Sequence, residues 1–330
     1  MSLIVTQSDR TDLPLVVMPS IIPSMTEPFK AALPVLHDIA RVSIHDDATL
    51  DENVIVDRCA DADAVMVIGF HVSESMFTRL ADHVRCFSFG GTGVASYIDL
   101  ARAREQGIAV TNVVRYGDHA VAEHAFALIM ELSRQVGRLD SIVRSGGWSG
   151  VDGIGLHGKT LGLVGFGGIA QAVSDMASGF GMPTLVWNSH LHADAVASHH
   201  VTPVDDLGDL LHHSDVVSIH LPLTTSTRGI ITSEHLNRLR PGTIIVNTAR
   251  AEVIRPGALA DRLLRGDLLA GLDVFDKEPL PQDDPLRSAP GTILTPHVAW
   301  RDDEAYRALS DQVVRAIAGF FTGSSVNRVV

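Results

Sequence analysis

The sequence predicts an α/β fold of two domains, each built around a parallel sheet, and three observations support this prediction. The chain has 330 residues, more than one hydrophobic core usually holds, so two domains are expected. Short apolar runs with strand character alternate with helical patterns in two separate series, as in parallel sheets whose strands are connected by helices. Between the two series, residues 160–170 read as a strand, a glycine turn and a helix.

The first series fills the N-terminal third of the chain. A longer helical pattern with an alanine-rich apolar face follows it at 120–144, and we interpret this pattern as a bridge between the domains. The glycine-rich segments 145–150 and 153–158 then read as a loop. In the first series, strands are expected at 13–18, 41–45, 64–68, 84–89 and 108–113, and helices at 25–39, 50–60, 75–81 and 98–106.

The second series begins at the glycine turn. Gly165, Gly167 and Ala170 occupy the three small positions of a dinucleotide-binding turn, which needs a tight bend, close approach of the backbone to a pyrophosphate, and close helix–sheet packing. A turn that serves packing alone has the same pattern. A final helix at 303–321 is expected to return to the first domain. Six strands of a doubly wound sheet are expected at 161–164, 184–187, 216–220, 243–247, 268–273 and 292–294, with a helix at 169–180.

Composition and charge argue against several classes of function. With 45% hydrophobic and 20% charged residues, the chain is typical of a folded globular protein. Its formal charge of −13 argues against nucleic acid or an anionic membrane as the main partner. Cys59 and Cys86 lack a metal-ligand spacing, and we expect no metal site. Residues 1–10 lack the features of a signal peptide, so a reducing cytoplasm is the expected location.

Polar groups follow several predicted strands, at the edge where doubly wound sheets bind ligands. Residues 89–94 expose successive backbone N–H groups, as an anion-binding turn does. Arg250 can hold a carboxylate and polarise a carbonyl, while His297 can exchange a proton and Glu278 can tune it. Each also has a plainer interpretation, such as a tight turn or a surface ion pair. Together these groups supply what hydride transfer to a 2-oxo acid requires, because negative charge develops on the carbonyl oxygen.

Ordered motifs extend over nearly the whole chain. They are Gly91-Thr92-Gly93, Ala120-Val121-Ala122-Glu123-His124, the glycine turn from Gly165, His220-Leu221-Pro222-Leu223-Thr224, Val246-Asn247-Thr248-Ala249-Arg250, Gly271-Leu272-Asp273-Val274-Phe275, Glu278-Pro279-Leu280 and Leu294-Thr295-Pro296-His297. With these motifs the chain resembles the D-isomer-specific 2-hydroxyacid dehydrogenase family, especially its glyoxylate reductase-like, hydroxypyruvate reductase-like and glycerate dehydrogenase-like members.

The resemblance implies an NAD(P)-dependent oxidoreductase that transfers hydride between a nicotinamide dinucleotide and a small 2-oxo or D-2-hydroxy acid. It implies two domains with Rossmann-like or flavodoxin-like parallel sheets, the cofactor domain being inserted into the substrate domain. We place the substrate domain at 1–110 with 298–330, and the dinucleotide-binding Rossmann domain at 111–297. A homodimer built largely on the cofactor domains is implied as well.

The resemblance also assigns roles to individual residues. Arg250 is expected to bind the substrate carboxylate and carbonyl. His297 is expected to be the general acid in reduction and the base in oxidation, and Glu278 to pair with it so that the protonated imidazole is available. Substrate contacts are expected at Thr92, Gly93, Arg250, His297 and Trp300, and cofactor contacts at Gly165, Gly167, Gly168, Ile169, Asn188, Ser189, Leu221, Pro222, Thr227, Thr248, Ala249 and Asp273.

One departure from the family pattern bears on the choice of cofactor. Asn188, followed by Ser189, stands where an acidic residue usually binds the adenosine ribose. An asparagine does not repel a 2′-phosphate as an aspartate would, and no arginine follows to hold that phosphate. Both NAD and NADP are therefore compatible with the sequence.

Three alternative functions stay open at this stage. One is a regulatory binding protein of the same fold that senses NAD(H). Another is an enzyme similar to phosphoglycerate dehydrogenase, and the third is an enzyme that oxidises an inorganic or one-carbon substrate on the same fold. The complete set of Arg250, Glu278 and His297 favours an enzyme over a sensor.

Overall fold

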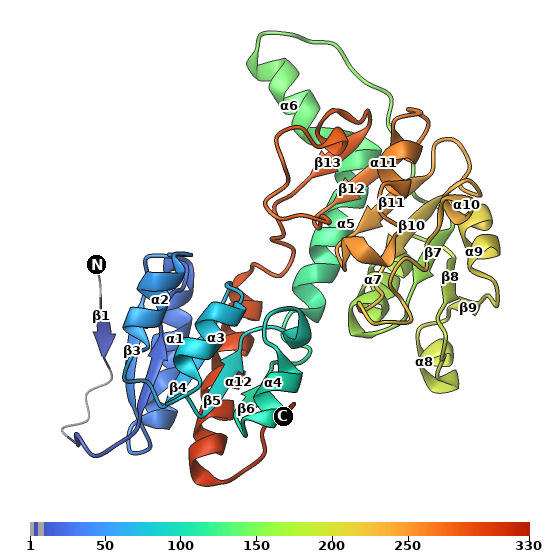
Figure 1. Cartoon of the computed structure of the whole chain (residues 1–330). Helices are drawn as coiled ribbons and strands as arrows, with labels where there is room; N and C mark the ends of the chain where they lie inside the picture. The colour runs from blue at the N-terminus through green and yellow to red at the C-terminus, as the bar shows by residue number, and fades with distance from the viewer. Residues whose placement is uncertain (1–2, 6–9) are drawn as a thin grey trace. The chain divides into compact units, whose positions relative to one another are not determined.

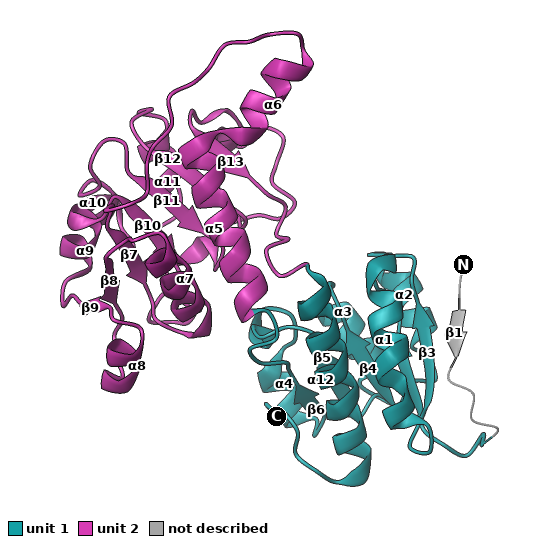
Figure 2. Cartoon of the chain, turned by 180° about the vertical axis from the view of Figure 1, so that it is seen from behind, with its two compact units in different colours: residues 1–117, 302–330 teal, residues 118–301 magenta. Residues whose placement is uncertain are grey.

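The computed structural model describes residues 3–5 and 10–330 (Figure 1). The expectation that residues 1–10 carry no signal peptide falls in part outside the described residues. The chain divides into two compact units (Figure 2): unit 1 is Met1–Gly117 with Asp302–Val330, and unit 2 is Asp118–Arg301. Unit 2 is thus inserted in the chain of unit 1. Each unit holds a sheet with helices, which confirms the predicted α/β class.

The sheet of unit 1 has the strand order β1-β3-β2-β4-β5-β6. Strands β2 to β6 run parallel to one another, whereas β1 pairs antiparallel with β3 and is absent from the sequence prediction. The central strands β4 and β5 are buried throughout, as is usual in a parallel sheet covered by helices. The strands are β1 Leu3–Val5, β2 Leu15–Met18, β3 Arg41–His45, β4 Ala64–Val67, β5 Cys86–Phe89 and β6 Ala109–Thr111.

Side-chain caps fix where several helices of unit 1 begin. Asp51, Ser73 and Asp99 each accept a hydrogen bond from a first-turn N–H, at the starts of α2, α3 and α4. The predicted helix at 25–39 is divided instead, with a 3₁₀ turn around Pro34, because proline cannot donate within a helix. α12 contacts α1, β5 and β6. The elements are η1 Pro23–Met25, α1 Thr26–Ala32, η2 Leu33–Leu36, α2 Glu52–Arg58, α3 Glu74–Leu80, η3 Val94–Ser96, α4 Leu100–Glu105 and α12 Asp303–Thr322.

All neighbouring strands in unit 2 are parallel, in the order β13-β12-β11-β10-β7-β8-β9. The sequence predicts all of them except β9, an edge strand of 2 residues. The order reverses between β7 and β10, and the carboxyl ends of the strands at such a switch point are where these sheets bind ligands. The strands are β7 Leu161–Val164, β8 Thr184–Trp187, β9 Thr202–Pro203, β10 Val216–Ile219, β11 Ile244–Asn247, β12 Leu269–Leu272 and β13 Thr292–Leu294.

The predicted continuous helix at 120–144 is wrong. Two helices, α5 and α6, form there and are separated at Gln135, whose backbone is left-handed with φ 51°. Both carboxylate oxygens of Glu131 accept the N–H of Gly137, at 3.0 and 3.2 Å, which stabilises the break. α5 packs against α7, β11, β12 and β13, so it covers the sheet of unit 2. The elements are α5 Asp118–Arg134, α6 Val136–Arg144, α7 Gly168–Gly179, α8 Ala193–Ser198, α9 Leu207–His213, α10 Ser233–Leu236, η4 Ala251–Val253, α11 Ala258–Leu263 and η5 Pro285–Ser288.

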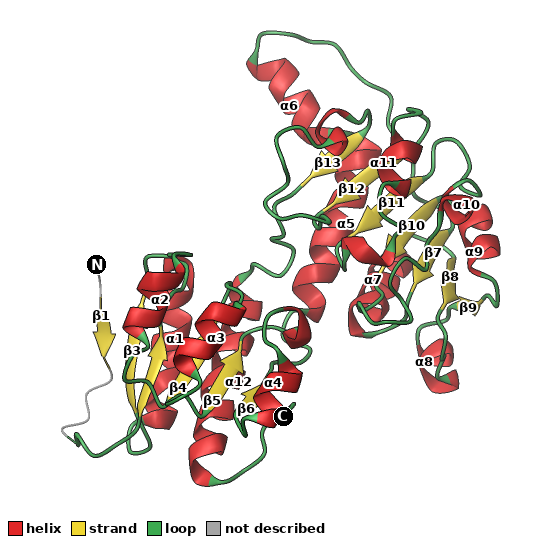
Figure 3. Ribbon diagram, viewed as in Figure 1, coloured by secondary structure: helices red, strands yellow, loops and turns green. Residues whose placement is uncertain are grey.

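Helices cover both faces of the unit 2 sheet (Figure 3). One core cluster joins α5 and α7 to the sheet, and the other joins α9, α10 and α11 to it. Consecutive residues of β10 take part in different clusters, Val216 in the first and Val217 in the second, because successive side chains of a strand point to opposite faces. Within the described part of the chain, none of the helices has the length and apolar composition of a membrane span.

Candidate active site

The glycine turn joins β7 to α7 at the carboxyl edge of the unit 2 sheet. Gly165 has φ 98°, and a Cβ there would lie 2.7 Å from the carbonyl oxygen of His220, so only glycine fits. At Gly167 a Cβ would meet nothing within 4 Å, which leaves open space beside the start of α7. No side chain of the described residues caps this helix. The first N–H groups, including those of Gly168 and Ile169, therefore suit a pyrophosphate.

Asn188 and Ser189 follow β8, the strand next to β7. The Asn188 side-chain amide donates to the carbonyl oxygen of His190 at 2.8 Å, and the Ser189 hydroxyl lies 3.2 Å from Nδ1 of the same histidine. Residues 188–192 include no aspartate, glutamate, lysine or arginine. This loop carries no fixed charge that would repel or hold a 2′-phosphate.

Three predicted cofactor positions follow β10. Leu221 is buried in the core and Pro222 is exposed. The Thr227 hydroxyl donates to the carbonyl oxygen of Pro222 at 2.6 Å and accepts the Thr224 N–H at 2.8 Å. Thr227 thus closes this loop on itself and fixes the backbone that borders the switch point.

Among the described residues, two buried polar groups at the carboxyl edge have no hydrogen-bond partner, and both lie in motifs that the sequence shows. His220 has its Nε2 2.8 Å from the Ser218 hydroxyl, but its Nδ1 has no partner among the described residues. Burial lowers the pKa of His220 to about 4, so this imidazole is neutral at neutral pH. The Thr248 hydroxyl is the second group, and it follows β11 as His220 follows β10. Such unsatisfied groups suit a polar ligand at this edge.

Asn247 shapes the turn that presents Arg250. Its side chain is 1% exposed, accepts the Ala249 N–H at 3.0 Å and donates to the Arg250 carbonyl oxygen at 3.0 Å. The Arg250 guanidinium donates to the Ala249 carbonyl oxygen at 2.7 Å through Nη1. This bond uses one N–H of the planar guanidinium, and its remaining N–H groups suit a carboxylate. The role of Asn247 in shaping the turn is visible only in the structure.

Glu278 and His297 form a close pair in unit 2. His297 Nδ1 lies 2.7 Å from Glu278 Oε2, and Glu278 Oε1 accepts the Phe275 N–H at 3.0 Å. Burial alone would raise the pKa of Glu278, but the hydrogen bond and charge of His297, the Phe275 N–H and the charge of Arg250 lower it below its usual value. The carboxylate is therefore ionised at neutral pH. With Nδ1 donating to Glu278, Nε2 is the ring nitrogen left for a substrate.

Asp273 lies at the end of β12 and is fully buried. The sequence predicts that Asp273 lies near the nicotinamide. In the structure, both of its carboxylate oxygens accept hydrogen bonds from residues 295–299, the segment that carries His297. Trp300 follows this segment and is half-buried. Arg250, Glu278, His297 and all the predicted cofactor positions belong to unit 2.

The predicted substrate positions Thr92 and Gly93 belong to unit 1 and follow β5. The Thr92 carbonyl oxygen accepts the Val94 N–H and the Asn112 side-chain amide, both at 3.1 Å, which fixes the turn. Among the described residues, the N–H groups of Thr92 and Gly93 donate to no acceptor. They are available to an anion.

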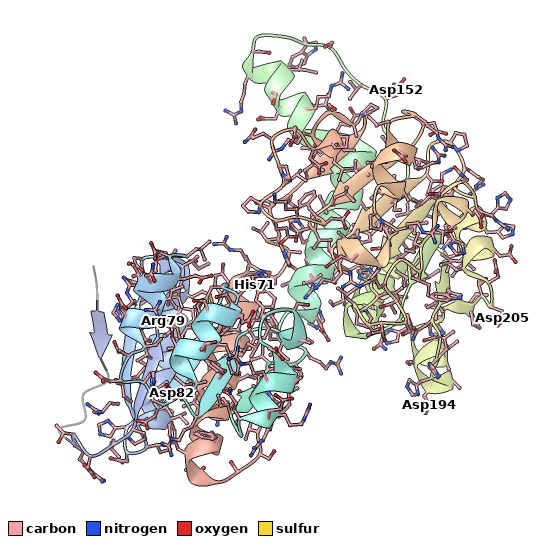
Figure 4. All side chains as sticks on the ribbon, viewed as in Figure 1. His71, Arg79, Asp82, Asp152, Asp194 and Asp205 are labelled. Carbon is pink, nitrogen blue, oxygen red and sulfur yellow. The ribbon has the colours of Figure 1, made fainter. Side chains whose placement is uncertain are left out.

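His71 is a fixed exposed residue of unit 1 that the sequence analysis does not identify. It follows β4 and is labelled in Figure 4. Its ring stacks on Tyr97 with centroids 4.1 Å apart and an interplanar angle of 7°, and its Nδ1 lies 2.9 Å from the Ser96 carbonyl oxygen. A histidine outside any motif cannot be recognised from the sequence, so the fixed position of the His71 ring is visible only in the tertiary packing.

The chain is similar to known proteins in both sequence and structure. A family model described as D-isomer specific 2-hydroxyacid dehydrogenase, NAD binding domain, matches residues 126–299. A hydroxypyruvate reductase from Blautia hydrogenotrophica is 33% identical over 304 residues, which cover 89% of this chain and 93% of the relative. A glyoxylate reductase from Korarchaeum cryptofilum is 35% identical over 285 residues, covering 84% and 85%. The apo-structure of D-lactate dehydrogenase from Escherichia coli matches with a TM-score of 0.85 at 26% identity, covering 96% and 100%.

Proposed function

Since the chain belongs to the D-isomer-specific 2-hydroxyacid dehydrogenase family, oxidoreductases that act on CH–OH donors with a nicotinamide cofactor, we propose that it reduces a small 2-oxo acid of the glyoxylate or hydroxypyruvate type. The observation that carries this proposal is the Glu278–His297 pair at 2.7 Å, with Arg250 near enough to lower the Glu278 pKa. A general acid and a carboxylate-binding group are what reduction of a 2-oxo acid requires.

Arg250 binds the substrate carboxylate and polarises the carbonyl in this proposal. Its planar guanidinium suits two parallel hydrogen bonds to a carboxylate, and Asn247 holds the backbone from which it extends. The backbone N–H groups of Thr92 and Gly93 are further donors for the carboxylate. Trp300 borders the substrate.

His297 exchanges the proton. Its Nδ1–H donates to Glu278, and the carboxylate stabilises the protonated ring, so Nε2 can donate a proton to the carbonyl oxygen during reduction. In the oxidative direction, Nε2 accepts the hydroxyl proton. Glu278 acts by orienting the ring and by balancing its charge, and it stays ionised throughout.

The nicotinamide cofactor supplies or accepts the hydride when it is bound. The open space at Gly167 and the uncapped start of α7 fit its pyrophosphate. We propose that the protein uses both NAD and NADP, because the loop at Asn188 neither repels nor holds a 2′-phosphate by charge. The residues that would hold the dinucleotide are Gly165, Gly167, Gly168, Ile169, Asn188, Ser189, Leu221, Pro222, Thr227, Thr248, Ala249 and Asp273.

A homodimer is part of the proposal, and α6 supports it. This helix extends from unit 2 (Figure 1), none of its residues is buried, and it exposes Val136 at 62% and Val143 at 53%. Trp148 in the following loop is 91% exposed. Large apolar side chains gathered in one projecting segment suit packing against a second copy of the chain. Light scattering on the purified protein measures this state, and a monomer at assay concentrations would contradict it.

The experiment that tests the function is a turnover panel. NADH and NADPH oxidation are measured with glyoxylate, hydroxypyruvate and pyruvate, and the binding of both cofactors is measured separately. The proposal expects turnover of glyoxylate or hydroxypyruvate with either cofactor. Tight cofactor binding without turnover of any 2-oxo acid would instead favour a sensor of NAD(H).

A further inference from the structure

The backbone that carries His297 is held in an unusual conformation. His297 has φ 53°, in the left-handed region that residues other than glycine rarely adopt. Its own N–H donates to the Thr295 carbonyl oxygen at 3.1 Å, which tightens the turn. A conformation of this kind persists only where the surrounding structure determines it, so the contacts of residues 295–299 show what fixes the ring.

A single buried carboxylate makes most of these contacts. Asp273 Oδ1 accepts the Thr295 hydroxyl at 2.6 Å and the Val298 N–H at 2.9 Å, and Oδ2 accepts the Ala299 N–H at 2.9 Å. These donors lie on both sides of His297 in the sequence. Burying a carboxylate is costly unless it is hydrogen-bonded, so Asp273 and the turn depend on each other.

His124 connects this turn to helix α5. Its Nε2 lies 3.0 Å from the Thr295 hydroxyl oxygen and 3.7 Å from Asp273 Oδ1. A hydroxyl has one proton, and Thr295 gives it to Asp273, so the oxygen accepts from His124 and Nε2 carries a proton. α5 packs against β12 and β13, the strands that precede Asp273 and Thr295. These hydrogen bonds therefore connect the packed helix α5 to the turn at residues 295–299.

We propose that His124, Thr295 and Asp273 form a positioning network that sets the orientation of His297. The network fixes the backbone of the turn, while Glu278 binds the ring from its Nδ1 side. His124 and Thr295 are assigned neither to the substrate nor to the dinucleotide, and Asp273 holds the turn in addition to its proposed place at the cofactor. The kinetic part of this inference rests on the proposed function.

Thr295→Val removes the hydroxyl but keeps the shape of the side chain. We expect kcat for the 2-oxo acid to fall about 100-fold, because a small misplacement of a catalytic group has an effect of this order. The dissociation constant for NADH and the KM for the 2-oxo acid should stay near the wild-type values. Thr295→Ser keeps a hydroxyl at this position and should therefore retain a kcat near that of the wild type. Thr292→Val is the matched control, since it removes a hydroxyl on β13 that donates to Ala289 outside the network.

A second measurement keeps the inference independent of turnover. The ring resonances of His297, observed by NMR in the free protein, should shift in Thr295→Val and in His124→Phe, and should stay in place in Thr295→Ser and Thr292→Val. Wild-type kcat in Thr295→Val, or unshifted His297 resonances in both Thr295→Val and His124→Phe, would overturn the network. Absence of turnover in the wild type would contradict the proposed function alone, and the resonances would still test the network.

Discussion

Glu278 is held in its ionised form by its surroundings. Burial favours the neutral carboxyl, but the hydrogen bond from His297, the Phe275 N–H and the charge of Arg250 together lower its pKa. A carboxyl group whose pKa is lower in the folded than in the unfolded chain stabilises the fold above its unfolded pKa, and this stabilisation is lost as the pH falls through the folded pKa. The Glu278–His297 pair should therefore persist from neutral pH into mild acid and fail only below the usual carboxyl range.

Glu278→Gln removes the charge while preserving the size of the side chain. We expect reduction of the 2-oxo acid to slow on the order of 100-fold at neutral pH, because the protonated His297 loses its counter-charge. The loss should shrink only as the pH falls through the lowered pKa of Glu278, because the wild-type carboxyl group is then protonated as well. The pH profile of kcat/KM measures this, with the exposed Glu234→Gln as control. A profile of Glu278→Gln identical to that of the wild type would remove Glu278 from the mechanism.

At the residue scale, the sequence identifies groups that stand in motifs and misses groups defined by packing. Arg250, Glu278 and His297 are predicted because each follows a recognisable strand within a family motif. The hydrogen bonds of Asp273 to residues 295–299 could not be predicted, since they depend on how the ends of β12 and β13 meet. The stacked ring of His71 is equally a product of tertiary contact.

Two substitutions in the glycine turn should have different effects, one on folding and the other on cofactor binding. Gly165→Ala would force an alanine to adopt φ near 98° and would place its Cβ 2.7 Å from the carbonyl oxygen of His220. We therefore expect a lower melting temperature. Gly167→Ala meets nothing within 4 Å and should fold normally. Its methyl group would occupy the space proposed for the pyrophosphate, and NADH should bind about tenfold more weakly, or about 1.4 kcal/mol.

Calorimetry of NADH binding and thermal melting distinguish these two effects. Gly155→Ala is the matched control, because a Cβ there also meets nothing within 4 Å and the residue is exposed in the loop that precedes β7. Unchanged NADH affinity in Gly167→Ala would show that the backbone at this turn does not approach the dinucleotide.

At the scale of elements, strands with strong apolar runs are the predictable part. The strands from β7 to β13 match their predicted positions except β9, which has 2 residues and no periodicity to detect. β1 has 3 residues and is missed for the same reason. The break between α5 and α6 escapes prediction because glutamine is a good helix former, and a carboxylate from the preceding turn stabilises the interruption.

At the scale of the whole molecule, the fold class follows from two α/β series and an inserted unit, and the functional class follows from motifs distributed over both units. The two boundaries between the units lie at Gly117–Asp118 and Arg301–Asp302. We propose that unit 1 is the substrate domain and unit 2 the cofactor domain. The chain thus places its proposed proton donor and carboxylate-binding arginine on the unit that has the glycine turn.

Turnover by Arg250→Ala and His297→Ala, measured beside their affinity for NADH, tests whether these two side chains carry the reaction. Both variants should reduce the 2-oxo acid about 10²–10⁴-fold more slowly than the wild type, because the carboxylate-binding group or the general acid is gone. NADH affinity and melting temperature should stay close to the wild-type values, since neither side chain is assigned to the dinucleotide. Unimpaired turnover in either variant would contradict the account.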